Sequence, residues 1–148
     1  MPIDRFATTF RVAAPPATVH AYLMDPHSYV GLAPLVVAVR DIRPHGDDIE
    51  YVAIERFRLG PFHHDNPIRV TLTSLEPDRS LKSAVASPGG VRLTSTVTLA
   101  PAEGGSAVTD EVVLESPWWV RWFAVRKARE AQQGRAAELT RRLAAPAP

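Results

Sequence analysis

The sequence has 148 residues, of which 45% are hydrophobic and 22% are charged, and its formal net charge is +1. These values are typical of one soluble globular domain, which we expect to span residues 1–148. The chain has no cysteine, no apolar run near the ~18 residues of a membrane span and no apolar signal segment near its start. Disulfide frameworks, cysteine-based zinc sites, thiolate nucleophiles and transmembrane helices are therefore excluded, and a bacterial-type cytoplasm is the expected location.

The N-terminal part of the chain predicts a strand followed by two short helices. Apolar and polar side chains alternate through residues 3–12, as in a half-buried strand. Val19 and Leu23 lie four residues apart and can dock on one face of a first helix. Asp25 followed by Pro26 is an N-cap with proline at the first helical position, which predicts a second short helix.

The middle of the chain predicts an antiparallel meander. Period-2 alternation is separated by turn residues such as Gly46, Gly89, Gly90 and Gly104, so each strand returns beside the previous one with one face buried. Residues 60–67 are expected to form a loop. The expected strands cover residues 3–12, 35–43, 49–59, 67–76, 80–87, 90–100 and 106–115, and the expected helices cover 15–24, 26–32 and 117–144.

The last long segment predicts a helix that closes a cavity. Ser116 is a typical N-cap and Pro117 a typical first helical residue. Apolar residues recur on one predicted inner face, which consists of Trp118, Trp122, Val125, Ala136, Leu139 and Leu143. Arg129, Gln132 and Gln133 interrupt that face where a plain core helix would carry leucine. Residues 145–148 are expected to be a frayed tail.

The same segment is strongly basic. From Pro117 onward it has seven Lys or Arg and two Glu, a net +5, which leaves −4 for the rest of the chain. A basic helix could bind an anionic membrane or nucleic acid. Alternatively, it could be a solvent-exposed face whose positive charge offsets the negative charge of the rest of the chain. We favour the second interpretation and expect Arg121, Lys127, Arg135 and Arg142 to be exposed and functionally quiet.

Several short motifs stand at fixed places in this order of elements. They are the Ala-Pro-Pro-Ala-Thr-Val stretch at residues 14–19, Leu23, Asp25, Pro26 and Tyr29 near the start, and the Glu-Gly-Gly-Ser turn at 103–106 with Ser116 and Pro117 near the end. Together they resemble the START-like, or SRPBCC, superfamily and its polyketide cyclase/dehydrase branch. His20 departs from that pattern, because an aromatic residue often follows the valine there.

The resemblance implies an α+β helix-grip fold, in which a curved seven-stranded antiparallel sheet grips the C-terminal helix around a cavity. The superfamily includes ligand carriers, lipid-transfer domains, hormone receptors, aromatase/cyclases and chaperone activators. The fold therefore leaves the function open.

Three polar residues are candidates for chemistry in such a cavity. Glu55 shares the apolar parity of its strand, which suggests a desolvated inward acid. The alternatives are that a bulge reverses the parity, or that Glu55 lies at the rim and pairs with an arginine. Asp110 shares parity with Val108 and Val112, although a shift of one residue would place Glu111 inside instead. Arg129 is a plausible partner for either acid, since a buried acid without a partner is costly.

The predicted ligand-binding set combines these residues with the inward apolar positions of sheet and helix. It consists of Tyr51, Ala53, Glu55, Phe57, Val70, Leu72, Leu93, Ser95, Val97, Asp110, Trp118, Trp122, Val125 and Arg129. The tryptophans could stack on a flat ligand or simply anchor the helix on the sheet. Small residues at Ala53 and Ser95 favour a pocket of roughly a few hundred Å³ over a solid core.

Other chemistries find little support. His63, His64 and Asp65 are adjacent in the predicted loop, where neighbouring side chains point apart, so surface residues are favoured over a metal site. The sequence has no Walker loop, dinucleotide fingerprint or G-x-S-x-G motif. No metal, cofactor or nucleic acid is expected.

Three functions remain. The favoured one is a carrier or sensor that binds a small hydrophobic or aromatic molecule, lipid-like or polyketide-like, as a monomer or homodimer. The second is a cyclase or dehydratase in which Glu55, Asp110 or Arg129 acts as acid, base or carbonyl polariser. The third is a membrane-surface or protein-interaction module that uses the basic helix.

Overall fold

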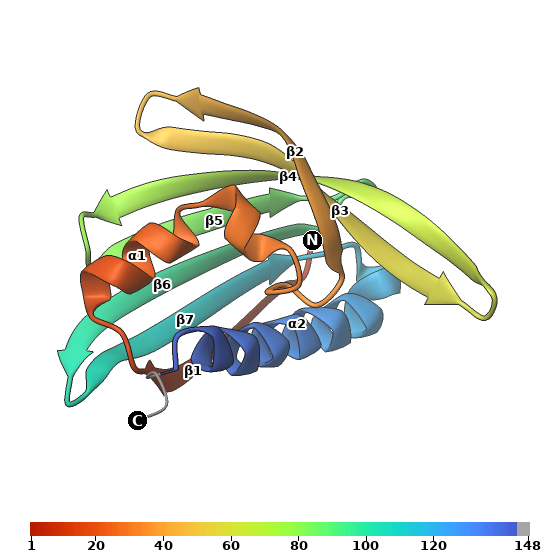
Figure 1. Ribbon diagram of the computed structural model, residues 1–148. Coiled ribbons are helices and arrows are strands. Elements are labelled where there is room, and N and C mark those ends of the chain that lie inside the picture. The colour runs from red at the N-terminus through yellow and green to blue at the C-terminus, as the bar shows by residue number, and fades with distance from the viewer. Residues whose placement is uncertain (145–148) are drawn as a thin grey trace.

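Seven antiparallel strands form one curved sheet in the order β1-β7-β6-β5-β4-β3-β2, as the computed structural model shows for residues 1–144 (Figure 1). The elements are β1 (Ile3–Val12), α1 (Pro16–Leu23), the 3₁₀ turn η1 (Pro26–Tyr29), β2 (Val36–His45), β3 (Asp48–Leu59), β4 (Phe62–Glu76), β5 (Ser80–Ala86), β6 (Arg92–Ala102), β7 (Gly105–Glu115), the 3₁₀ turn η2 (Trp118–Val120) and α2 (Arg121–Arg142). This order confirms the predicted α+β helix-grip fold. The expected frayed tail, residues 145–148, lies outside the described residues.

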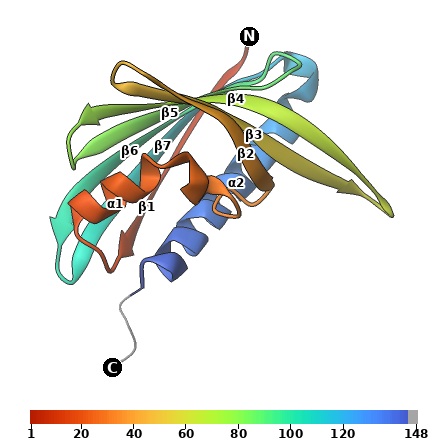
Figure 2. The same ribbon diagram turned by 45° about the horizontal axis from the view of Figure 1, so that its top comes forward.

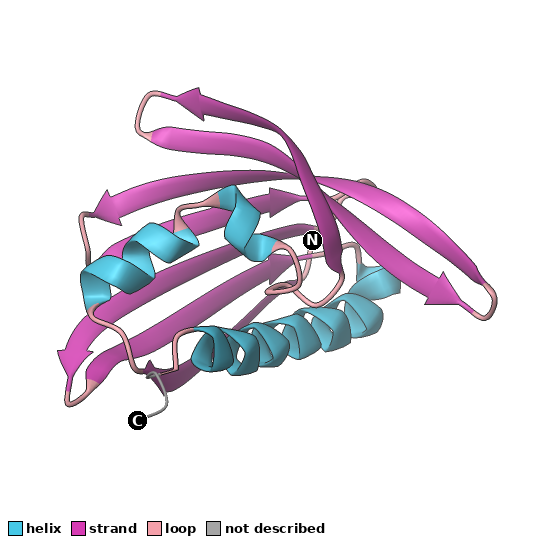
Figure 3. Cartoon of the chain, viewed as in Figure 1, coloured by secondary structure: helices cyan, strands magenta, loops and turns pink. Residues whose placement is uncertain are grey.

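All the helical segments lie on the concave face of the sheet (Figure 3). The view in Figure 2 shows α2 running diagonally across that face, with α1 and η1 beside it. From β2 to β7 each strand pairs with the next one along the chain, and the first strand, β1, pairs with the last, β7, with Phe6 opposite Val112. The chain therefore returns to its start before α2 begins, which brings α2 back over the sheet.

Side chains alternate between the two faces of the sheet along each strand, and this alternation decides which of them face the helices. Along β7, Val108, Asp110, Val112 and Leu114 are buried on the concave face, so of the two possible parities the structure has Asp110 inward and Glu111 outward. Most of the core lies under α1, η1 and the second half of α2. Its larger members include Val19, Leu23, Tyr29, Leu32, Tyr51, Leu72, Leu81, Leu99, Val108 and Leu139. In the described part of the chain, no helix is long and apolar enough to cross a membrane.

The predicted loop at residues 60–67 is wrong. Leu59 pairs with Phe62, so Gly60 and Pro61 alone form the turn, with Gly60 at φ +62°. Glycine adopts this left-handed backbone without strain, which allows a two-residue hairpin turn. The β3–β4 hairpin consequently extends into a long arm that projects away from the body of the molecule (Figures 1 and 2).

The predicted start of the last helix is also wrong. Pro117 has extended backbone angles, the chain first makes the 3₁₀ turn η2, and α2 begins at Arg121. The Ser116 hydroxyl is buried without a hydrogen-bond partner and caps nothing. By contrast, the Asp25 cap is as expected, because its carboxylate accepts a hydrogen bond of 3.0 Å from the His27 N–H.

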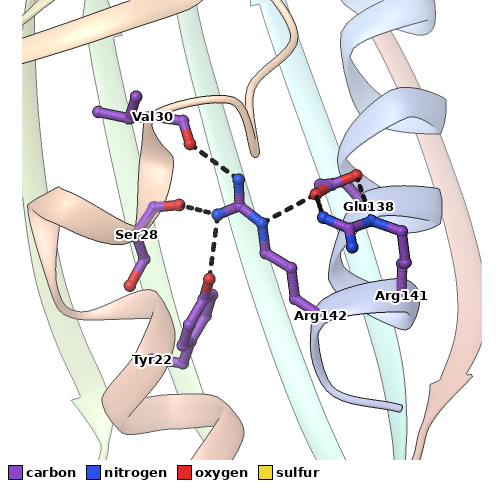
Figure 4. Close-up of polar contacts among 6 residues, drawn as sticks. All are labelled: Tyr22, Ser28, Val30, Glu138, Arg141 and Arg142. Atoms are coloured by element: carbon purple, nitrogen blue, oxygen red, sulfur yellow. Dashed lines mark hydrogen bonds and ion pairs between the residues drawn. The ribbon is translucent and has the colours of Figure 1, made fainter.

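Arg142 fastens the end of α2 to the α1–η1 segment (Figure 4). Its guanidinium donates to the Tyr22 hydroxyl at 3.0 Å, to the Ser28 carbonyl at 2.7 Å and to the Val30 carbonyl at 2.8 Å. Glu138 accepts from Arg142 at 2.9 Å and also pairs with Arg141. The expectation that Arg142 is a free surface cation is therefore wrong.

Candidate functional site

A groove of about 450 Å³ runs between the sheet and the first half of α2. Its sheet wall comes from β3, β4, β5 and β6, and its other wall comes from η2 and α2. The apolar residues that line it are Ala33, Pro34, Leu35, Phe57, Ile68, Val85, Val91, Leu93, Trp119, Val120, Phe123, Ala124, Ala128 and Ala131. Its volume is in the range of small-molecule sites.

The groove exists because α2 presents small side chains to the sheet at this point. Ala124, Ala128 and Ala131 follow each other at helical spacing and all line the groove. Across from them stand larger but half-buried or buried residues such as Leu93 and Ile68. Methyl groups on the helix cannot reach across to fill the space, so the two walls remain apart.

Polar groups line both walls of the groove, with Lys127 and Glu130 on α2 and Glu55, Asn66 and Ser87 on the sheet side. Glu55 on β3 lies opposite Asn66 on β4, and the Asn66 amide donates to the Ser87 hydroxyl at 3.5 Å. Burial raises the pKa of the Glu55 carboxyl above its ordinary value, and the Asn66 side chain offsets this rise in part. A carboxyl group in this position can donate a hydrogen bond when protonated and accept one when ionised.

Aromatic residues of η2 and α2 frame the groove. Trp119 and Phe123 are one helical turn apart, and both line the groove while remaining 62% and 44% exposed. The Lys127 ammonium lies 5.7 Å from the centre of the Phe123 ring. A flat or apolar ligand in the groove would therefore meet an aromatic side and a single nearby cation.

The second half of α2 closes on the sheet around Asp110. This carboxylate is 2% exposed and pairs with the Arg135 guanidinium, and the Ser95 hydroxyl donates to it at 2.6 Å. The Gln132 amide donates to the Asp110 carbonyl oxygen at 3.0 Å. The space left among these groups and Leu139 is only about 10 Å³, close to that of one water molecule.

Two buried tyrosines extend this closed end. The Tyr29 hydroxyl donates to the Leu23 carbonyl at 2.6 Å, and the Tyr29 and Tyr51 ring centres are 6.2 Å apart. Burial raises the pKa of both phenols, so both are neutral at ordinary pH. The two rings lie close together, the Tyr29 hydroxyl is hydrogen-bonded, and neither tyrosine lines the groove.

The structure separates the three polar candidates. Glu55 lines the groove and Asp110 lies in the closed end, so the two acids do not share a site. The predicted partnership of Arg129 is wrong, because Arg129 is exposed and lies over the Phe6 ring at 4.9 Å. The partner of Asp110 is Arg135, which was expected to be a surface cation and instead has its side chain largely buried.

The predicted aromatic face of α2 is rotated away from the sheet. Trp118 and Trp122 are 79% and 70% exposed, so they neither anchor the helix nor line the groove. Val125 and Arg129 border a shallow outer surface of the same helix. The face was assigned by hydrophobicity, whereas the helix turns its alanines and its Asp110-binding polar residues inward.

The remaining predicted ligand-binding residues divide between groove and core. Phe57 and Leu93 line the groove with Glu55, and their role in binding stays a prediction. Ser95 and Val97 belong to the closed end. The other four, Tyr51, Ala53, Val70 and Leu72, are buried core residues of the sheet.

Histidines do not form a metal centre in the described residues, where no group of three or more potential ligands gathers. His63 and His64 stand in β4 with exposed side chains, and the neighbouring Asp65 forms a bidentate ion pair with Arg56 at 2.8 and 3.1 Å. His20 lies 3.0 Å from the Ser74 hydroxyl at the edge of the core.

Sequence reasoning missed Arg135 and most of the helix wall of the groove. The signal for the wall was present as alanine at positions 124, 128 and 131, a stripe of small residues at helical spacing. Arg135 lies one turn beyond Ala131 on the same face of the helix, and Gln132 also points to the sheet from there. A search for a small-and-polar face would have found both.

Comparison with known proteins identifies the family to which this fold belongs. The curved sheet, the gripped helix and the groove between them define a helix-grip protein of the START-like superfamily. The chain belongs to the polyketide cyclase/dehydrase and lipid transport family, whose family model matches residues 4–147. Among curated proteins, none matches the chain.

Solved structures share the fold at low sequence identity. The di-domain ARO/CYC StfQ of the steffimycin pathway matches with a TM-score of 0.76 and 12% identity, over 96% of this chain and 51% of that one. The chain thus spans about half the length of that two-domain protein. Protein CV1439 from Chromobacterium violaceum matches with a TM-score of 0.69 and 15% identity, over 97% and 99% of the two chains. Ara h 8.0201 matches with a TM-score of 0.66 and 11% identity, over 93% and 98%.

Proposed function

We propose that this protein binds a small hydrophobic or aromatic molecule, lipid-like or polyketide-like, in the groove between the sheet and the first half of α2. The observation that carries the proposal is the groove itself, with its volume of about 450 Å³ and walls made mainly of apolar side chains. Water in such a space has few polar partners, so an apolar ligand that displaces it gains the free energy of burying its surface.

The polar wall would orient the ligand. Glu55, Asn66 and Ser87 form the polar strip among the apolar residues of the sheet wall. The raised pKa of Glu55 favours the protonated acid, which donates a hydrogen bond to a carbonyl or hydroxyl oxygen. A ligand with an apolar body and one polar end fits this distribution, as small-molecule sites commonly show.

A groove-filling variant tests the proposal. Ala131→Trp places a large ring in the groove from the helix side, whereas Ala137→Trp adds the same ring at an exposed position of α2. With the neutral apolar dye Nile red, we expect fluorescence enhancement for the wild type and A137W and roughly tenfold weaker binding or less for A131W. Equal dye binding by A131W and the wild type would refute the groove as the binding site. Circular dichroism melts of the three proteins control for folding.

A second candidate function is a cyclase or dehydratase, which the buried carboxyl of Glu55 favours. Its raised pKa suits the carboxyl group to donate a proton to a substrate carbonyl. The carboxylate that remains can then act as a base and remove a proton from an acidic C–H group. Two structural neighbours, StfQ and BexL, are described as ARO/CYC proteins, which is in line with such chemistry. Glu55→Gln would then keep Nile red binding and lose turnover of a linear poly-β-ketone thioester, while turnover unchanged in E55Q would exclude this role.

The proposal also includes a cytoplasmic, bacterial setting and a monomer or homodimer. Neither metal nor nucleic acid takes part in it. Size-exclusion chromatography with light scattering of the purified protein measures the oligomeric state directly.

A further inference from the structure

An exposed aromatic patch covers the start of the helical segment. We define it as Trp118, Trp119, Trp122 and Phe123, whose exposed fractions are 79%, 62%, 70% and 44%. Contiguous exposed apolar surface of this kind often marks an interaction site on a soluble protein. The proposed ligand occupies the groove and leaves Trp118 and Trp122 unexplained.

The N-terminal end of β1 lies beside the segment that leads into the patch. The Ser116 N–H donates to the Pro2 carbonyl at 3.3 Å, and Ile3 pairs with Glu115, the last residue of β7. The side chains of Met1 and Ile3 are exposed as well. Backbone pairing thus joins the segment before the patch to the start of β1, whose Asp4 and Phe6 face the side of α2.

Cations surround the aromatic residues. Between Trp118 and Glu130 the chain carries Arg121, Arg126, Lys127 and Arg129 against the single acid Glu130. Arg121 pairs with Asp4, and Glu130 pairs with both Arg126 and Lys127. The four cations and these two acids leave a net charge of +2 around the aromatic residues. The surface is therefore aromatic at its centre and cationic around it.

We propose that this patch docks the protein on an anionic lipid bilayer. Tryptophan is the residue that settles best at the boundary between headgroups and acyl chains, and Lys and Arg beside it gain attraction from anionic headgroups. A second copy of the chain fits the patch less well. A two-fold interface would bring the cationic cluster against its own copy, because the same surface faces itself in such an interface.

Docking would bring the groove to the membrane. Trp119 and Phe123 belong both to the patch and to the groove lining, so the groove opens beside the docked surface. A lipid-like ligand could then pass between bilayer and groove without crossing bulk water. This last step rests on the proposed function, whereas the docking itself rests only on the exposed aromatics and the charge around them.

The chain carries its own probe for the test, because its three tryptophans all lie in the patch. In buffer we expect the emission of water-exposed indole. Vesicles of phosphatidylcholine with phosphatidylglycerol should shift it to shorter wavelength, pure phosphatidylcholine should shift it less, and high salt should reverse the electrostatic part. Flotation of the full-length protein with the same vesicles measures binding independently.

Variants separate docking from ligand binding. Trp118→Ala with Trp122→Ala removes the two residues that lie outside the groove, and we expect vesicle affinity to fall roughly tenfold or more while Nile red binding persists. Val37→Ala with Leu75→Ala, at exposed apolar positions of β2 and β4, is the matched control and should float like the wild type. A131W should lose Nile red and keep flotation.

Three results would overturn the inference. The first is a wild-type protein that neither floats nor shifts its emission. The second is flotation of the Trp118/Trp122 double variant at wild-type affinity. The third is a wild type that is already dimeric and blue-emitting in buffer, with W118A/W122A monomeric, since a second copy would then cover the patch.

Discussion

The two halves of α2 meet the same sheet in different ways. The second half sends Gln132, Arg135 and Leu139 down to the strands, and almost no space is left among them. The first half presents Ala124 and Ala128, and a groove of about 450 Å³ remains. The size of the inward side chain therefore decides where the helix packs and where it spans a ligand-sized space.

Gly134 lies close to the boundary between these halves. A Cβ atom at this position would be 2.5 Å from Cγ of Pro34, which itself lines the groove. The segment before β2 thus touches the helix here and ends the groove. An interior glycine costs a helix about 1 kcal/mol, and this close approach is the reason for its presence.

The largest effect should come from the buried ion pair of the closed half. Arg135→Met leaves Asp110 buried without its cation, and we expect the free energy of unfolding to fall by about 3–5 kcal/mol in urea denaturation. The double variant Asp110→Leu with Arg135→Met removes both charges and should regain much of that loss. A single variant as stable as the wild type would show that the closed end does not depend on this pair.

A pair of leucine truncations compares the two halves directly. Leu139 is 1% exposed in the closed end, so Leu139→Ala should cost about 2–5 kcal/mol through lost burial and a new cavity. Leu93 already borders the open groove, so Leu93→Ala removes fewer contacts and should cost only about 1 kcal/mol. Equal losses for both variants in the same denaturation experiment would contradict the distinction between a packed and an open half.

The boundary itself can be tested with Gly134→Ala. On an exposed helix this change stabilises by about 1 kcal/mol, but here the added methyl group meets the Pro34 ring. Overpacking of this kind costs about 1–3 kcal/mol, so the variant should unfold at a lower temperature than the wild type. A higher melting temperature would mean that the segment around Pro34 moves aside freely.

The smallest effect concerns pH and the end of α2. Hydrogen bonds from Arg141 and then Arg142 lower the pKa of Glu138 to about 2. A depressed folded-state pKa adds stability above the ordinary value of 4.5, and this contribution is lost as pH falls through about 2. Thermal melts should therefore show a small advantage of the wild type over Glu138→Gln at neutral pH that shrinks below pH 4.5. An advantage constant with pH would point to packing instead of charge.

The sheet could be predicted from the sequence because each strand carries its own alternation and each turn its own glycine or proline. Alternation alone leaves two parities for the last strand, with either Asp110 or Glu111 inward, and the structure places Asp110 and Val112 inward. The arm beyond residue 60 was not predicted, because pairing of His63 with Arg58 depends on the turn at Gly60 and not on hydrophobicity.

The rotation of α2 could not be predicted in the same way. Trp118 and Trp122 are among the largest side chains of the segment, yet both point outward. Its orientation is decided by tertiary contacts: the pairing of Arg135 with Asp110 and the approach of Pro34 to Gly134. The partner of the buried acid was missed for the same reason, since it depends on which cation the rotated helix brings inward.

Methyl NMR during titration with 2-naphthol tests the central claim most directly, because it observes both halves of α2 in one sample. Binding in the groove predicts saturable shifts of the Ala124, Ala128 and Ala131 methyl signals, while those of Leu139 and Val108 in the closed end stay unchanged. Shifts centred on Leu139 and Val108, or no saturable shift at the three alanines, would contradict a ligand-binding groove under the first half of α2.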